Sequence, residues 1–172
     1  MFVLYAKFLF TFSILWHKVW ILYYGYKVGL PVRLLLIHDL NKFTSKQFGA
    51  YALHYATRRG FIGVVPNSLV EYFIQADFRK AHEEHGQSNK HHYGYWESRH
   101  TTMPDESVCE MVVDWLAATR VYSGKPAPRE LSQWDWWTNN RQKFMDKPYI
   151  DATKLEFIVR IVHTKALTPW RG

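Results

Sequence analysis

Apolar residues dominate the start of the chain, where MFVLYAKFLFTFSILW carries a single charge, Lys7, before His17 and Lys18 interrupt the run. A membrane-spanning helix needs about 20 mostly apolar residues. A signal peptide needs a basic start and a small-residue cleavage site, and both are missing here. We therefore expect a buried core helix over about residues 5–26 and no transmembrane span, with a membrane-associated segment as the alternative.

Apolar positions at helical spacing continue beyond this segment, separated by Gly and Pro residues. After Gly25 and Gly29, Pro31 starts a short second helix that carries His38 and Asp39 near its C-terminal end. Further helices are expected at about 45–59, 68–85, 104–122, 129–145 and 152–166. The chain shows no strand alternation and no internal repeat. The predicted fold class is therefore all-α, a bundle of six to seven helices that forms a single domain over residues 1–172.

Local signals refine the ends of these helices. Capping residues mark three predicted starts: Thr44, Ser68 with Glu71, and Thr153 with Glu156. The sequence of residues 60–67 predicts a connecting loop. Residues 86–102 are rich in Gly, Ser, Asn and His, and they predict a long structured loop of the kind that often carries function.

Composition narrows the class of partner and the compartment. The chain is 48% hydrophobic and 22% charged, which excludes a disordered protein. Its net charge of +7 suits an anionic partner such as a phosphate ester, a nucleotide or a polynucleotide. No run of five like charges is present, so a nucleic-acid-binding arm is disfavoured. The single Cys109 excludes a disulfide framework and a multi-cysteine zinc site, so a cytoplasmic location is expected.

The candidate chemistry centres on HDLNKF at 38–43, which follows the apolar run VRLLLI. A His-Asp pair in such a setting is costly unless its charge is compensated, and these two side chains are good ligands for a first-row divalent metal. His17 lies in the apolar first helix. Asp114 lies in EMVVDWLAAT, with Glu110 one turn earlier on the same helix face. Taken singly, His17 is more often a satisfied core histidine and an HD dipeptide is weak evidence. Asp114 could instead pair with an Arg or a helix N-terminus elsewhere.

Together, His17, His38-Asp39 and Asp114 follow the order H…HD…D. In this respect the chain resembles the HD-domain metal-dependent phosphohydrolases, in which four such residues hold a divalent metal inside a helical bundle. The resemblance implies an HD-like helical fold.

A second stretch, HEEHGQSNKHHYGYW at 82–96, makes the chain resemble more closely a family of small viral and bacterial HD-like proteins. Their pattern runs HDxSK, then H…NxHH, then Met-Pro and EMxxDW. The chain matches it with HDLNK, the histidines around Asn89, Met103-Pro104 and EMVVDW, over about residues 15–120. Asn41 replaces the commoner Ser, with little expected consequence, and Asn89 is expected to orient the loop.

The resemblance implies a mono- or dinuclear site for a divalent metal ion (Mn, Fe, Co, Zn or Mg). The implied ligands are His17, His38, Asp39, His85, His91, His92 and Asp114. Asp39 would bridge two ions, and Lys42 would bind phosphate or protonate the leaving oxygen, so Asp39 and Lys42 are the predicted catalytic residues. The candidate substrate-binding residues are His82, Arg79, Trp96 and Trp20.

The predicted function is a metal-dependent phosphohydrolase that acts on a nucleotide or a related small phosphate ester. One alternative is an HD-type diiron oxygenase, which the additional histidines permit. The other is a basic helical nucleic-acid-binding module with a structural metal. A homo-oligomer is compatible with the aromatic segment QWDWW at 133–137, which otherwise belongs to the core.

Overall fold

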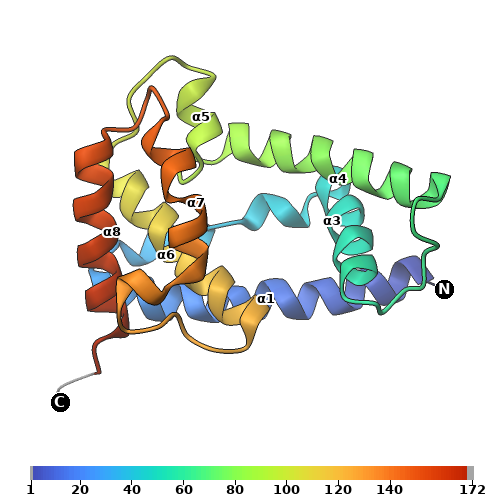
Figure 1. Cartoon of the computed structure of the whole chain (residues 1–172). Helices are drawn as coiled ribbons and strands as arrows, with labels where there is room; N and C mark the ends of the chain where they lie inside the picture. Colours follow the sequence, from blue (N-terminus) through green and yellow to red (C-terminus); the bar gives the residue numbers. More distant parts are fainter. Residues whose placement is uncertain (1, 170–172) are drawn as a thin grey trace. The chain divides into compact units, whose positions relative to one another are not determined.

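The computed structural model describes residues 2–169, apart from the side chains at positions 45 and 46, and this part of the chain is all-α with no strand (Figure 1). Its elements are α1 (Phe2–Val28), α2 (Val32–Ile37), η1 (Leu40–Phe43), α3 (Ser45–Arg58), α4 (Leu69–Ser88), α5 (Tyr93–Glu97), α6 (Asp105–Ser123), η2 (Leu131–Gln133), α7 (Asp135–Met145) and α8 (Ala152–Leu167). The predicted fold class is confirmed. The described residues contain eight α-helices rather than six to seven, because α5 forms inside the predicted 86–102 loop.

The chain packs into two compact units. Unit 1 contains the residues up to Leu15 together with Asp39–Asn89, and unit 2 contains Trp16–His38 and the residues from Lys90 onward. Each unit has its own apolar core. The single domain expected from the sequence stays a prediction.

The core of unit 1 joins the first half of α1 to α3 and α4. Phe10 of α1 stacks on Tyr51 of α3, with ring centroids 5.8 Å apart, and Tyr51 meets Phe78 of α4 edge-on at 5.3 Å. Ala52 and Ala56 are fully buried on the same face of α3. Their small side chains let the helices approach closely, so the aromatic rings fill the space that remains.

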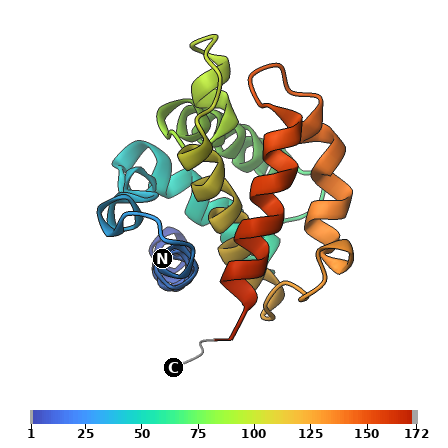
Figure 2. The same ribbon diagram turned by 90° about the vertical axis from the view of Figure 1, so that its left-hand side faces the viewer.

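The core of unit 2 is built on α6 and α8, which lie side by side in Figures 1 and 2. Met111 and Leu116 of α6 and Leu155 and Val159 of α8 are almost completely buried. Aromatic side chains of α7 and the residue before it complete this core: the Trp134 indole donates to the Thr119 hydroxyl at 3.0 Å. The QWDWW segment therefore contributes to the core, the second of its two expected roles.

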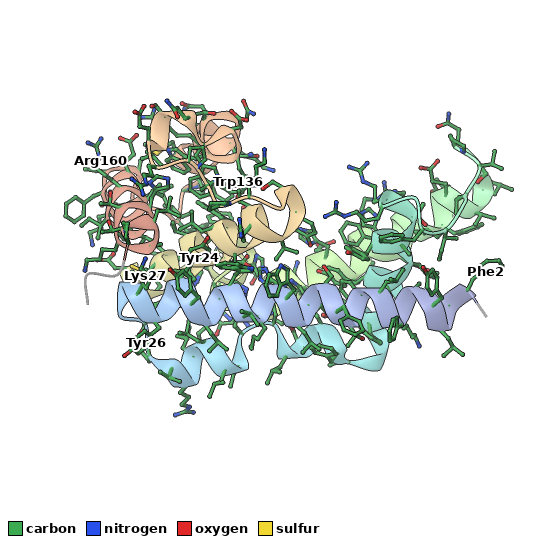
Figure 3. The ribbon with its side chains drawn as sticks, turned by 90° about the horizontal axis from the view of Figure 1, so that it is seen from below. Phe2, Tyr24, Tyr26, Lys27, Trp136 and Arg160 are labelled. Carbon is green, nitrogen blue, oxygen red and sulfur yellow. The ribbon has the colours of Figure 1, made fainter. Side chains whose placement is uncertain are left out.

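The end of α1 is fixed within unit 2 by a close approach to α2. A Cβ atom on Gly25 would lie 2.3 Å from a methyl carbon of Leu35, so any larger residue would have to displace this fully buried side chain. Figure 3 shows Tyr24 and Tyr26 on different sides of α1, and their exposures are 2% and 61%. Lys27 also donates to the Ala166 carbonyl at 2.7 Å, which ties the end of α1 to α8.

Helix α1 differs from the expected core helix, because only one of its faces is buried. In its most apolar 18-residue window, 28% of the residues are buried. The helix is long and apolar enough to cross a membrane, but that is weak evidence because core helices and signal sequences meet the same criteria.

Several local predictions need correction. Helix α2 ends at Ile37, so His38 is its C-terminal cap and Asp39 lies beyond it, because Asp39 adopts a left-handed conformation with φ of 60°. Helix α4 continues to Ser88 rather than ending near His85. The first six residues of the predicted helix 129–145 instead contain the short η2 and a break, and α7 begins at Asp135.

The helix caps were predicted with mixed success. The Ser68 hydroxyl accepts from the Glu71 amide at 3.2 Å, as expected, although the Glu71 carboxylate accepts from the Asn67 amide and not from Ser68. Thr44 precedes α3 but makes no side-chain cap bond. For α8 the predicted cap was wrong: the Asp151 carboxylate, and not Thr153, accepts from the Lys154 amide at 3.0 Å. Gly124 ends α6 in the left-handed conformation that glycine favours.

Candidate metal centre

His38 is the central residue of a buried cluster in unit 2. Its Nδ1 lies 2.9 Å from Oε1 of Glu110 on α6, and the residue is 3% exposed. Lys18 donates to the His38 carbonyl and so fixes the end of α2 beside α1. An ionised glutamate accepts the Nδ1 proton, which leaves the lone pair of the imidazole on Nε2.

Asp114 contacts this Nε2 atom of His38 and also the imidazole of His17. Its Oδ1 lies 2.9 Å from Nε2 of His17 and 3.4 Å from Nε2 of His38. The ligand atoms of these three residues lie within 4.8 Å of one another. They come from α1, the end of α2 and α6, so unit 2 itself brings together three of the predicted ligands. We call His17, His38, His91, Glu110 and Asp114 the Asp114 cluster.

The charge of Asp114 follows from its surroundings. Burial raises the pKa of the Asp114 carboxyl, but hydrogen bonds from His17 and His38 and the charges of these residues lower it further, so its pKa is well below the usual value. When His17 and His38 are protonated at Nε2, these protons supply the positive charge that the ionised carboxylate needs. When the two Nε2 atoms carry lone pairs instead, a bound cation must supply it.

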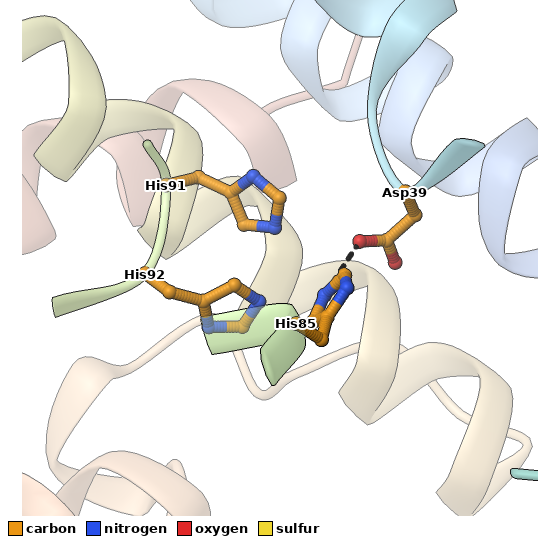
Figure 4. Close-up of side chains that lie close together, drawn as sticks. All are labelled: Asp39, His85, His91 and His92. Carbon is orange, nitrogen blue, oxygen red and sulfur yellow. Dashed lines mark ion pairs between the residues drawn. The ribbon is translucent and has the colours of Figure 1, made fainter. Parts of the chain in front are cut away.

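His91 joins the cluster through Glu110. Its Nδ1 lies 3.4 Å from Oε1 of Glu110, and its ring centroid lies 4.1 Å from that of His38. His38, His91 and Glu110 form a second group whose ligand atoms are within 4.8 Å of one another. The ring of His92 lies next to that of His91, with centroids 4.3 Å apart (Figure 4). Glu110 is the member that the sequence prediction left out, although its spacing of one helical turn from Asp114 was the signal.

A separate cluster lies in unit 1 around Asp39. Oδ1 of Asp39 lies 3.0 Å from Nε2 of His85, as Figure 4 shows, and Oδ2 lies 2.6 Å from the Lys42 ammonium. Asp39 is 3% exposed, and the His85 residue is completely buried. The i, i+3 spacing brings Lys42 back to Asp39 through η1. We call Asp39, Asn41, Lys42 and His85 the Asp39 cluster.

Asn41 contacts His85 directly, and the expectation that Asn in place of Ser has little consequence stays a prediction. Oδ1 of Asn41 lies 3.0 Å from Nδ1 of His85, and the Asn41 amide donates to the Ser88 hydroxyl at 3.1 Å. Nδ2 of Asn89 lies 3.1 Å from the same Nδ1, and these contacts direct Nε2 of His85 at Asp39. Asn89 donates to the His85 carbonyl at 2.8 Å, which agrees with an orienting role.

The backbone at Asp39 is a further sign of a functional position. It is one of three non-glycine residues with positive φ among those described, the others being Asn67 and His100. Such a conformation is uncommon for a non-glycine residue and often occurs at functional sites. At Asp39 it interrupts the helical backbone between the end of α2 and the start of η1.

The predicted substrate-binding residues are more dispersed. In unit 1, His82 is exposed and its Nδ1 lies 3.3 Å from the Tyr51 hydroxyl, and Arg79 is exposed. In unit 2, Trp96 donates to the Lys90 carbonyl at 2.7 Å, and Trp20 packs on the core with the Arg120 guanidinium 4.7 Å from its ring. Both tryptophans thus have structural contacts, and their role in binding a base stays a prediction.

These observations define a helical protein with buried groups of histidines and carboxylates that could hold a metal ion. The chain belongs to DUF5662, a family of unknown function, whose model matches residues 7–163 and therefore includes both clusters. No curated protein and no solved structure matches the chain. The HD-domain resemblance stays a prediction.

Proposed function

We propose that the protein is a metal-dependent phosphohydrolase acting on a nucleotide or a related small phosphate ester. The observation that supports this most directly is the convergence of the His17 and His38 Nε2 atoms on one oxygen of Asp114. The HD-domain resemblance and the net charge of +7 favour a phosphate substrate.

The donor set fits a first-row divalent ion. Two imidazole nitrogens and a carboxylate oxygen are suitable ligands for such ions. The Glu110 carboxylate accepts from Nδ1 of His38, which fixes the tautomer in which Nε2 is free of a proton. His17, His38 and Asp114 would hold the ion, and the group of His38, His91 and Glu110 offers ligand atoms for a second one. The sequence prediction adds Asp39, His85 and His92 to these ligands.

A divalent ion held in this way polarises a phosphoryl oxygen and lowers the pKa of bound water. The remaining work falls to the residues of the chain. Glu110 holds the His38 ring in place, and Asn41 does the same for His85. In the proposed reaction, the Lys42 ammonium exchanges its contact with Asp39 for a phosphate oxygen or donates a proton to the leaving oxygen.

The proposal is tested by elemental analysis of the purified full-length protein, followed by assays of phosphate release. Nucleoside mono-, di- and triphosphates are presented to the metal-free protein with Mn²⁺, Fe²⁺, Co²⁺, Zn²⁺ or Mg²⁺. We expect co-purified metal, phosphate release that requires it, and a higher Tm when the metal is restored. Unchanged phosphate release after complete removal of the metal would contradict the proposal.

The same measurements separate the two alternatives. Two irons per chain with oxygen consumption and no phosphate release would indicate the diiron oxygenase. Metal that affects only Tm, combined with steeply salt-dependent binding of DNA or RNA, would indicate the nucleic-acid-binding module.

A further inference from the structure

Exposed apolar side chains are concentrated at the start of the chain. Among the described residues, the large hydrophobic side chains that are exposed all lie within residues 2–73, except Tyr122 and Phe157. Most of them belong to unit 1, which is the smaller of the two units. Isolated exposed apolar residues are normal, but a concentration of this kind usually marks a surface for binding a protein or a membrane.

The first half of α1 carries one part of this apolar surface. Leu4, Phe8 and Phe12 recur every four residues along one face of the helix and are 74%, 59% and 60% exposed. Ala6 and Phe10, which lie on the opposite face, are buried in the core of unit 1. This half of α1 is therefore apolar on two opposite faces. One face packs in the core of unit 1, and the other is exposed.

The loop between α3 and α4 carries the other part. Its sequence, GFIGVVPN, is unusually apolar for a connection, because loops normally face water. Val65 is 73% exposed, and Leu69 and Phe73, one turn apart at the start of α4, are 76% and 62% exposed. Figures 1 and 3 place this loop and the start of α4 at the same end of unit 1 as Phe2. We call this surface the apolar end of unit 1: the exposed residues of 2–12 and 61–73.

Charge indicates what covers this surface. The segments 2–12 and 58–73, which carry this surface and the residues directly before the loop, contain three basic residues, Lys7, Arg58 and Arg59, and one acidic residue, Glu71. Arg58 and Arg59 lie exposed at the end of α3, directly before the apolar loop. A second copy of the chain would bring the same positive charge to the contact, whereas an anionic surface would neutralise it.

We propose that the apolar end of unit 1 docks on the surface of a membrane that contains anionic lipids. Its apolar side chains enter the boundary between headgroups and acyl chains, and Arg58 and Arg59 pair with the lipid phosphates. A lipid surface suits a set of side chains from separate elements, because it has no fixed shape that they must match. The inference does not depend on the proposed hydrolase activity.

Flotation of the full-length protein with lipid vesicles tests this inference. We expect binding to vesicles of phosphatidylcholine mixed with phosphatidylglycerol, weaker binding to phosphatidylcholine alone, and loss of binding as salt is raised. The double variant Val65→Asp and Leu69→Asp should reduce binding at least about 100-fold, because two apolar side chains no longer enter the lipid. Replacing Arg58 and Arg59 by Ala should reduce it roughly 10- to 30-fold at low salt and weaken the salt dependence.

Phe157→Asp provides the matched control, because this residue is 65% exposed but lies on α8 in unit 2. It should bind vesicles like the unaltered protein, and all variants should keep the same helical circular dichroism. Absence of vesicle binding, or an equal loss in Phe157→Asp, would overturn the inference. So would concentration-dependent self-association in sedimentation that the Val65→Asp and Leu69→Asp variant abolishes without any vesicle binding, since the surface would then join two copies of the chain.

Discussion

The two buried aspartates meet imidazoles in similar ways but differ in their other partner. Asp39 lies between the His85 imidazole and the Lys42 ammonium, which is 2.6 Å away. Asp114 instead contacts two imidazoles, those of His17 and His38. A lysine carries its charge at neutral pH, whereas a neutral imidazole supplies none. The comparison teaches that Asp39 has a built-in counter-charge and that Asp114 depends on a proton or a metal.

The largest expected effect is the loss of bound metal when Asp114 is replaced. Asp114→Asn removes the negative charge while keeping the shape of the side chain, and metal content should fall by more than about 100-fold. Elemental analysis and titration calorimetry with Mn²⁺ measure this. Asp39→Asn supplies the comparison: the sequence prediction of a shared ligand requires that it also lose metal. Full metal binding in Asp114→Asn would exclude the Asp114 cluster as the metal centre.

Glu110→Gln should cause the next largest effect, a decrease in metal affinity. The amide keeps the size of the side chain but no longer favours the Nδ1 proton of His38 as a carboxylate does, so metal affinity should fall about 10- to 100-fold. Glu106→Gln is the matched control, because Glu106 lies one turn earlier on α6 and is exposed. Equal metal affinity in the two variants would mean that Glu110 has no part in orienting the ligand.

Lys42→Gln tests the counter-charge of the Asp39 cluster. Because an amide cannot supply the ammonium charge, phosphate release should fall about 100-fold while bound metal is retained. Parallel assays of metal content and of kcat separate these quantities. A loss of metal in this variant would instead assign Lys42 to the stability of the Asp39 cluster.

The smallest effect is expected at His163, a buried histidine outside both clusters that stacks on Trp134. Burial lowers the pKa of His163 below its ordinary value, and a hydrogen bond to the Pro128 carbonyl opposes this only in part. Since the unfolded chain then binds the proton more readily, the stability contribution is fully present above about pH 6.5 and is lost as pH falls toward the lowered pKa. Thermal unfolding between pH 7 and 5 should show a decrease in stability that His163→Gln reduces. An unchanged pH slope in the variant would contradict this assignment.

The sequence predicted the long helices well because their signals are local. Helix α6 begins at Asp105 and ends before Gly124, within a residue of the prediction, since its acidic first turn and its glycine stop act on neighbouring residues. The 86–102 segment was harder to predict. Its polar composition suggested a loop, but burial of Tyr93 against the core of unit 2 stabilises the short α5.

The sequence also named most members of the two clusters, but not how they pair. The order H…HD…D identified His17, His38 and Asp114, which lie together in unit 2. It could not show that Glu110 faces His38, because that depends on how α6 packs against the end of α2. Nor could it show that the Asn41 side chain meets His85, which is 44 positions later in the chain. Helical spacing defines neighbours within an element, whereas these contacts join different elements.

Gly25 has a consequence for the evolution and the engineering of this protein. A Cβ atom there would displace the buried Leu35 side chain between α1 and α2. These two elements carry His17 and position His38, whose rings lie 5.8 Å apart, so we expect Gly25 to influence this distance. Variation at this position would misalign both ligands at once without altering either of them. A random screen for folded variants that have lost their metal should therefore recover Gly25 alongside the ligands themselves.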